Sequence, residues 1–192
     1  KTKLIDEGRI QNRRGTRITF HPDAEIFGKG AAFKPARLYR MARAKAYLFG
    51  GVEIRWHCAP ALIKDETPAE DVLHFPGGLV DFLRAEIGEQ DWVTADPFSG
   101  KVSRAGAHGA AEWAIAWHGG GEGIVHSYCN TVPTSEGGTH EAGLRAALTK
   151  GLKAYGELVG NRKAAQIQAE DVLGTATVLL SVFIREPEFQ GQ

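Results

Sequence analysis

The stretch SYCNTVPTSEGGTHEAGLRAALTK, residues 127–150, joins an apolar segment to the start of the longest predicted helix. Its first six residues have the β-branched and aromatic content of a strand, which Pro133 ends. The pair Gly137–Gly138 allows positive φ angles or a close backbone approach. Thr139 is the expected N-cap of the helix, and Glu141 lies in its first turn, where a negative charge is favourable. The pattern predicts a strand–turn–helix unit.

Apolar residues recur every three or four positions beyond this turn, so a helix over residues 139–159 should bury one stripe against a core. The stripe consists of Leu144, Leu148, Leu152, Tyr155 and Val159. Three bases lie off the stripe, namely Arg145, Lys150 and Lys153, and Arg162 and Lys163 follow them. Between positions 145 and 163 a single acid, Glu157, opposes these bases. This basic segment is either a solvated helix face or a local footprint for phosphate.

Composition allows one domain or two small ones, because the 192 residues are 43% hydrophobic and carry no net charge. The charge is unevenly spread. Residues 1–75 carry 14 Lys and Arg against 9 Asp and Glu, and residues 76–192 carry 9 against 14. The breaker run Pro76–Gly77–Gly78 falls at the same point. We therefore expect one unit at 1–76 and another at 77–192.

Several classes of protein are disfavoured. No apolar run approaches the roughly 20 residues that span a bilayer, and Lys1–Arg14 is too polar for a signal peptide, so we expect a cytoplasmic protein without a membrane partner. Cys58 and Cys129 are isolated, which fits a reducing compartment better than a disulfide scaffold. A metal site at His57 and Cys58 would need two further ligands that the spacing does not offer, so no metal ligand is predicted.

The spacing of apolar residues, together with the prolines and glycines that end helices and strands, predicts the remaining elements. The first unit should hold strands at 15–20 and 51–57, a helix at 36–48 and a short strand at 71–75, with 25–33 as a loop. The second should begin with a helix at 79–87. Strands at 112–118 and 123–132 should pair as an antiparallel hairpin, and a short helical turn should lie within 167–173. Residues 175–184, TATVLLSVFI, are apolar on both faces toward their end and predict a central strand, which should form part of a sheet with 112–118 and 123–132.

The segment EGGTHEAGLRAAL resembles the B subunits of bacterial type IIA topoisomerases, which are DNA gyrase and topoisomerase IV. Three further segments resemble the same family: GTRITFHPD at 15–23, the stretch from RAKA to GGVEI at 43–54, and AEDV with LSVFIREPEFQGQ at 169–192. The sequences of these segments are closer to topoisomerase IV than to gyrase. The resemblance covers nearly the whole chain.

The resemblance implies an α+β fold. Residues 1–76 would be the C-terminal part of a GHKL-type ATPase domain. Residues 77–192 would be a transducer domain like domain 2 of ribosomal protein S5, without its C-terminal helix. This domain type has a left-handed βαβ crossover, against the general right-handed rule.

The resemblance also assigns residues to a nucleotide site that binds ATP and Mg²⁺. Thr16 would help to recognise adenine, and Gln192 would reach the γ-phosphate. The alternative for Thr16 is simple packing within a strand. The family's catalytic glutamate, Mg²⁺-binding asparagine and phosphate lid precede the Gly-Thr strand, and Lys1–Arg14 does not supply them. We therefore expect no catalytic residue in this chain and no ATP hydrolysis by it alone.

Partners implied by the resemblance are a second B subunit contacted through the ATPase domain, the topoisomerase A subunit and double-stranded DNA. Arg145, Lys150 and Lys153 would face the DNA segment to be passed, unless Arg145 only pairs with Glu141 at i, i+4 spacing. The implied function is to couple ATP binding and hydrolysis to strand passage, in decatenation and relaxation.

Three alternatives remain. Supercoiling would indicate a gyrase. A mismatch-repair ATPase of the same superfamily should lack the GGTHEAGLR sequence. An RNA-binding module like the ribosomal protein domain needs a basic surface, which the net charge of −5 over residues 76–192 opposes.

Overall fold

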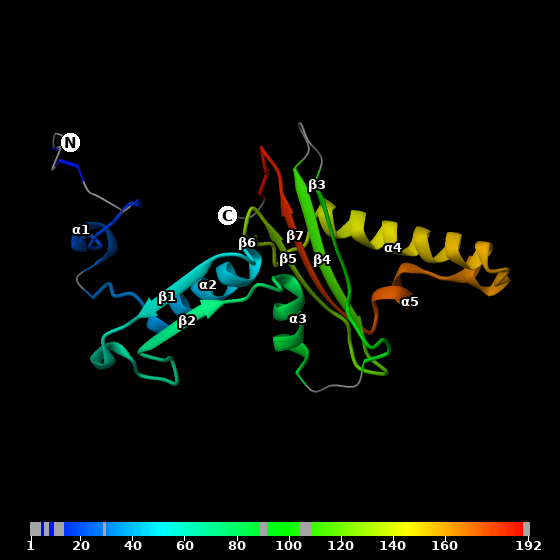
Figure 1. The fold of residues 1–192 in the computed structure, drawn as a ribbon, viewed down its shortest axis with the longest axis horizontal. Coiled ribbons are helices and arrows are strands. Elements are labelled where there is room, and N and C mark those ends of the chain that lie inside the picture. The colour runs from blue at the N-terminus through cyan, green and yellow to red at the C-terminus, as the bar shows by residue number, and fades with distance from the viewer. Residues whose placement is uncertain are drawn as a thin grey trace. The chain divides into compact units, whose positions relative to one another are not determined.

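The computed structural model describes residues 5, 8–9, 14–28, 30–88, 92–103 and 109–189 (Figure 1). The chain divides into an N-terminal unit, residues 1–34, and a main unit, residues 35–192.

The N-terminal unit contains one short helix, α1 (Ala24–Phe27), among its described residues. Asp23 caps this helix by accepting a hydrogen bond from the Glu25 N–H at 2.9 Å, although the sequence predicted a loop here. The predicted strand at 15–20 is wrong: these residues have no regular structure, and Phe20 is 72% exposed. An isolated strand leaves its backbone groups unpaired, and no described residue pairs with this segment.

The main unit opens with α2 (Pro35–Leu48), which starts on a proline, and a hairpin of β1 (Glu53–His57) and β2 (Glu70–His74). The short 3₁₀ helix η1 (Pro60–Leu62) lies in the hairpin loop. Tyr39 of α2 donates to the Asp71 carboxylate at 2.5 Å and meets the Trp56 ring edge-on, so α2 packs on the hairpin. The predicted helix and both of these strands are confirmed.

The larger sheet has five strands in the order β3-β4-β7-β5-β6. Their bounds are β3 (Phe98–Ser103), β4 (Ala110–Trp117), β5 (Ile124–Cys129), β6 (Val132–Pro133) and β7 (Ala176–Phe183). All neighbours are antiparallel except β5 and β7, which run parallel. The predicted hairpin of the 112–118 and 123–132 strands is therefore wrong, because β7 lies between them.

The central place of β7 follows from its sequence. Six of the eight residues of ATVLLSVF are apolar, and every residue except Phe183 is buried. A strand of this kind is stable only where layers cover both of its faces. The glycine-rich loop after β4 is long enough to leave room for β7 between β4 and β5.

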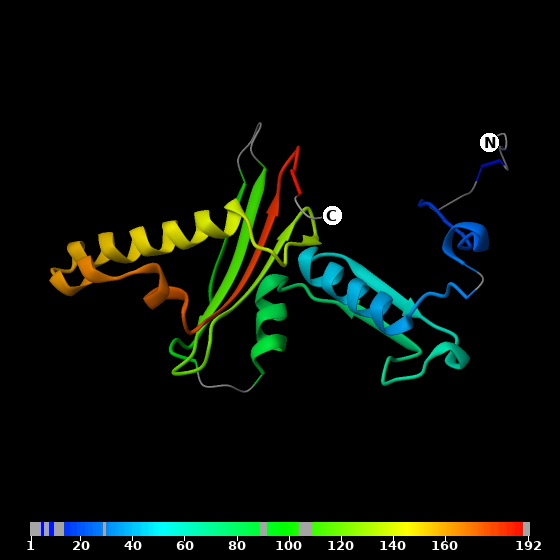
Figure 2. The same cartoon turned by 180° about the vertical axis from the view of Figure 1, so that it is seen from behind.

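Helices cover both faces of the five-stranded sheet (Figures 1 and 2). On one face, α3 (Leu79–Ile87) buries Leu79 and Leu83 against Ala114, Ala116 and Leu179. On the other face, α4 (Thr139–Leu158) and α5 (Ala169–Leu173) pack on the alternate strand residues Ile115 and Val178. The two-residue period of β4 thus separates two cores.

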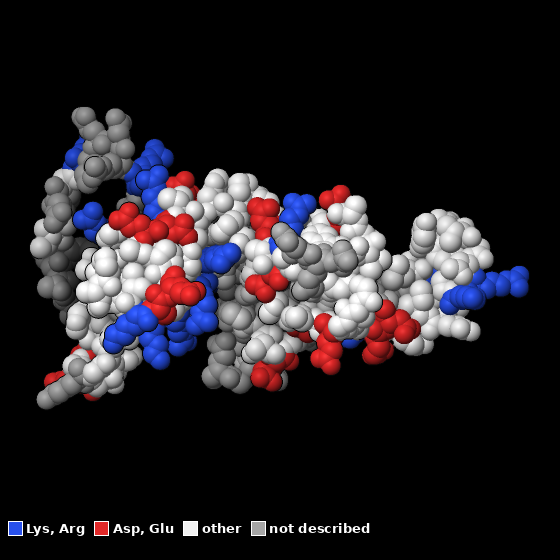
Figure 3. All heavy atoms as spheres, turned by 90° about the horizontal axis from the view of Figure 1, so that it is seen from below, with Lys and Arg blue, Asp and Glu red and all other residues white. Residues whose placement is uncertain are grey.

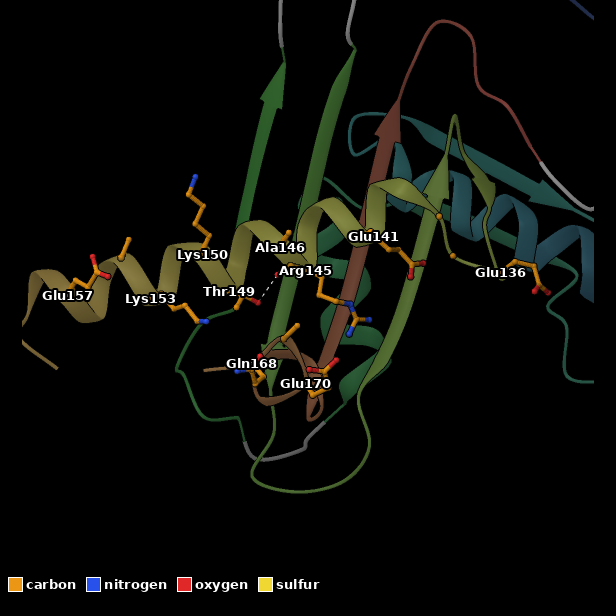
Figure 4. A pocket seen from close by; sticks show the side chains of 15 residues that line it. Glu136, Glu141, Arg145, Ala146, Thr149, Lys150, Lys153, Glu157, Gln168 and Glu170 are labelled. Atoms are coloured by element: carbon orange, nitrogen blue, oxygen red, sulfur yellow. Dashed lines mark hydrogen bonds between the residues drawn. The ribbon is translucent and has the colours of Figure 1, made fainter. Parts of the chain in front are cut away.

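The connection β5–α4–β7 is a crossover between adjacent parallel strands. Figures 2 and 4 show both strands pointing upward, β5 to the right of β7, and α4 in front of the sheet. A chain that passes in front and enters the strand on the left follows a left-handed crossover, the rare form that the sequence resemblance implied.

Helix α4 confirms the predicted span but corrects two details. Gly138, not Thr139, is the N-cap, and no side chain caps the helix. Leu144 and Leu148 pack on the sheet, whereas Leu152 and Tyr155 are 41% and 63% exposed. The reason is length: a 20-residue helix spans about 30 Å, so α4 extends beyond the sheet, where it contacts the 3₁₀ helix η2 (Arg162–Gln166) (Figure 1).

The predicted boundary at Gly77 lies between β2 and α3. The two sheets on either side of it are separate, while the elements of residues 35–192 form one unit. The division into 1–76 and 77–192 therefore stays a prediction. None of the helices in the described ranges combines the length and apolar character needed to cross a membrane.

Candidate functional site

An open groove of about 870 Å³ runs along α4 and is bounded by the start of α5. We call it the α4 groove. The three bases that the sequence predicted to face DNA all line it. Figure 4 shows Arg145 and Lys153 pointing toward the α5 side of the helix, whereas Lys150 points to the opposite side. This follows from the helix, since five residues correspond to about 140° of rotation.

Four carboxylates also line the α4 groove: Glu136, Glu141, Glu157 and Glu170. Glu136 and Glu170 come from segments before and after α4, so the helix sequence alone did not reveal them. The groove therefore carries mixed charge. Such a surface favours weak contact with phosphates over tight binding.

Arg145 does not form the ion pair with Glu141 that its spacing allowed. Within the described ranges, no carboxylate lies within ion-pair distance of Arg145, Lys150 or Lys153. The Glu141 carboxylate instead accepts a hydrogen bond from the buried Ser127 hydroxyl at 2.5 Å. The charge of Arg145 is thus available to a partner.

A chain of hydrogen bonds fixes the turn before α4. Ser127 Oγ lies 2.5 Å from Thr134 Oγ1, which lies 3.0 Å from His140 Nε2. Because Ser127 donates its single proton to Glu141, Thr134 donates to Ser127 and His140 donates to Thr134. The GGTHE motif therefore supplies His140 and Glu141 as ties that hold the start of α4 to β5.

Surface charge is mixed on the face that Figure 3 shows. In the view from below, Lys and Arg are interspersed with Asp and Glu, and neither sign covers this face (Figure 3). Among the residues that the structure describes, no group of three His, Cys, Asp or Glu side chains could hold a metal ion.

Of the two predicted nucleotide residues, the structure describes Thr16. Thr16 is exposed and lies in the irregular part of the N-terminal unit, and Gln192 lies outside the described residues. Their roles toward ATP stay predictions.

A contact that was not predicted from the sequence joins the end of α2 to the turn between β5 and β6. Lys45 Nζ donates to the Thr131 carbonyl oxygen at 2.8 Å and also contacts Thr131 Oγ1. Burial lowers the pKa of Lys45. The sequence offered one signal, since Asn130–Thr131 between two apolar residues is a possible two-residue hairpin turn.

Comparison with known proteins identifies the family. The family model for DNA gyrase B matches residues 78–192, more than half of the chain. The chain belongs to the DNA gyrase B family. Relatives within it are topoisomerase IV proteins: the B subunit of DNA topoisomerase 4 from Bartonella bacilliformis is 54% identical over 191 residues, which are 98% of this chain and 28% of the relative.

A second relative, the B subunit of DNA topoisomerase 4 from Caulobacter vibrioides, is 56% identical over 94% of this chain and 26% of its own length. The chain thus spans less than a third of these type IIA topoisomerase B subunits. Their names confirm the family that the GGTHEAGLR segment indicated.

Solved structures confirm the fold class. The 43K ATPase domain of Thermus thermophilus gyrase B, solved with an aminocoumarin, superposes with a TM-score of 0.72 at 26% identity. The match covers 88% of this chain and 44% of that one. The topoisomerase IV ATP-binding domain of Francisella tularensis, at 24% identity and a TM-score of 0.66, shows the same fold.

Proposed function

We propose that this chain is the coupling part of an ATP-dependent type IIA topoisomerase B subunit of the topoisomerase IV type. Residues 1–76 would end the ATPase domain, and residues 77–192 would form the transducer. The start of the gyrase B family match at Gly78 supports this division.

One observation carries the coupling role: the end of α2 is part of the core of the five-stranded sheet. Leu48 belongs to the same buried cluster as Leu83, Tyr128 and Leu179. A displacement of α2 must therefore move α3 or the sheet, because close-packed cores transmit strain. Nucleotide-driven movement in an ATPase domain would reach the transducer by this path.

ATP and Mg²⁺ are the proposed cofactors. The Thr16 hydroxyl fits a role toward adenine, since it is exposed and makes no hydrogen bond within the described part of the chain. When bound, ATP supplies the phosphoanhydride whose hydrolysis drives the cycle. The residues of this chain would orient it: Thr16 at the base and Gln192 at the γ-phosphate. The general base and the Mg²⁺ ligand would come from outside this sequence.

The proposed partners are a second B subunit, the A subunit and double-stranded DNA. The transported DNA segment must enter and leave, which requires phosphate contacts without base readout. The mixed charge of the α4 groove suits such a contact.

The test is decatenation by the complete B subunit combined with its A subunit. We expect ATP-dependent unlinking of DNA circles and relaxation of supercoils. ATP-dependent introduction of negative supercoils would instead assign the protein to the gyrases. The 192-residue chain alone should hydrolyse no ATP above background. Absence of ATP-dependent strand passage in the reconstituted enzyme would contradict the proposal.

A further inference from the structure

The turn between β5 and β6 has an unusual backbone. Asn130 and Thr131 both have positive φ angles, 48° and 67°, and Cys129 pairs with Val132 across them. Two-residue hairpin turns of this type favour Asn followed by Gly. Asparagine tolerates this conformation, but a β-branched residue is strained in it. Such strain, held in a buried position, indicates a use for the Thr131 side chain.

That use is the contact with Lys45. The Lys45 ammonium donates to the Thr131 carbonyl oxygen at 2.8 Å, and Thr131 Oγ1 provides a second oxygen beside it. The two residues are 86 positions apart in the sequence. Glycine at position 131 would relieve the strain but would remove one of the two oxygens.

The neighbouring Asn130 binds the end of β7. Its side-chain Nδ2 donates to the Ile184 carbonyl oxygen at 2.9 Å, and its Oδ1 accepts from the Ile184 N–H at 2.9 Å. The Asn130 backbone N–H also donates to the Val182 carbonyl oxygen at 2.8 Å. The side-chain amide thus acts as an additional peptide group and extends the β5–β7 ladder by one step.

Ile184 is where the chain leaves the sheet toward the segment that ends in Gln192. Five residues later, Phe189 packs back on the cluster of Cys129, Leu180 and Val182. The described part of this segment is therefore fixed at Ile184 and again at Phe189. Phe49, just after α2, also meets Phe183 with ring centroids 5.7 Å apart. The end of α2 thus contacts the end of β7 directly as well as through the turn.

We propose that the Asn130–Thr131 turn is a positioning element that transmits the position of α2 to the segment after β7, described over residues 184–189, and so tunes the γ-phosphate contact proposed above. This inference rests on the proposed function. In it, Lys45, Thr131, Asn130 and Ile184 form one continuous path. None of these four residues needs to touch the nucleotide.

The test is Asn130→Gly in the complete B subunit with its A subunit. Glycine keeps the positive φ and removes both hydrogen bonds to Ile184. We expect kcat for ATP hydrolysis to fall about tenfold, a barrier increase of about 1.4 kcal/mol. The affinity for ADP should remain unchanged, because ADP lacks the γ-phosphate that Gln192 would contact. If the role of Asn130 were purely structural, the substitution would reduce both kcat and the affinity for ADP.

Asn161→Gly is the matched control. The Asn161 side chain also accepts one backbone hydrogen bond, from the Lys163 N–H at 3.2 Å, but it lies beyond α4. Its kcat should equal that of the wild type. If the wild-type enzyme hydrolyses ATP and Asn130→Gly has the same kcat, the positioning role is wrong but the proposed function stands. If the wild-type enzyme does not hydrolyse ATP, the proposed function is wrong.

The substitution Thr131→Gly provides a second, independent test of the proposal. It relieves backbone strain and loses the hydroxyl contact with Lys45, so we expect a melting temperature equal to or above that of the wild type together with a lower kcat. Thr131→Ser, which keeps the hydroxyl, should restore kcat. Parallel losses of melting temperature and kcat, or no loss of kcat in Thr131→Gly, would overturn the proposal.

Discussion

The rings of Tyr47 and Phe82 lie parallel, with centroids 4.6 Å apart and an angle of 6° between their planes. Phe75 stacks on Tyr47 as well, at 3.7 Å. Tyr47 lies in the last turn of α2, and Phe82 lies in α3, so the three rings join the α2 hairpin region to the five-stranded sheet. This stack crosses the predicted domain boundary at Gly77.

Phe82→Ala should destabilise the chain by about 2–4 kcal/mol, because it removes a partly buried ring and leaves a cavity beside Tyr47. Urea unfolding followed by circular dichroism measures this change. Phe27→Ala is the control. Phe27 is 65% exposed, and we expect its free energy of unfolding to stay within about 0.5 kcal/mol of the wild type. Equal effects of the two substitutions would argue against a structural role for the stack.

Two glycines of α4 should respond in opposite directions to alanine. A Cβ at Gly151 would meet no atom within 4 Å, so Gly151→Ala should stabilise the helix by about 0.5–1 kcal/mol. A Cβ at buried Gly156 would overlap the Cβ of Ala164 in η2, so Gly156→Ala should destabilise by about 1–3 kcal/mol. Thermal unfolding of both variants tests the packing of α4 on η2. A stabilised Gly156→Ala variant would show that η2 does not hold this position.

The two cysteines should differ in reactivity. Cys129 is buried, and burial raises the pKa of its thiol, so little thiolate is present or accessible at neutral pH. Cys58 is partly exposed. We expect iodoacetamide to modify Cys58 at least about tenfold faster, as measured by peptide mass spectrometry.

The pH dependence of Cys129 alkylation tests whether folding raises the pKa of its thiol. Because folding raises the Cys129 pKa, its native alkylation rate should rise at a higher pH than in the urea-unfolded chain. In urea the two cysteines should react at similar rates. Equal native rates would contradict the burial of Cys129.

Local sequence patterns predicted the individual helices and strands of the main unit. The period of 79–87 predicted the whole of α3, and the mostly apolar sequence of 175–184 predicted the central place of β7 in the sheet. Strand neighbours were harder to predict. Alternation in 112–118 and 123–132 is the same for a hairpin as for two strands separated by β7, so the sequence could not distinguish them.

The candidate site shows the same limit. The helical period predicted that Arg145 points away from Leu144, and the α4 groove contains it. The carboxylate of Glu170 reaches the same groove through tertiary packing, 25 positions away, which no local pattern encodes. Lys45 and Thr131 are likewise joined across the fold. Exposed residues 15–20 alternate like a strand, but alternation supplies no partner strand.

Arg145→Gln tests the α4 groove in the complete enzyme. The substitution removes a positive charge that no described carboxylate pairs with, so it should weaken a phosphate contact and leave the helix intact. We expect a smaller ratio of the ATPase rate with DNA to the rate without DNA, and slower strand passage. The salt dependence of DNA binding should also become shallower, by about one phosphate contact.

Arg84→Gln is the matched control, because it removes the same charge from α3, where Arg84 lies 3.5 Å from Asp96 and outside the α4 groove. If the groove contacts DNA, the two variants should differ in DNA stimulation at low salt and converge as salt screens the contact. A general effect of net charge would lower stimulation equally in both. DNA stimulation that is unchanged in Arg145→Gln at every salt concentration would leave Arg145 a solvated helix residue without a role toward DNA.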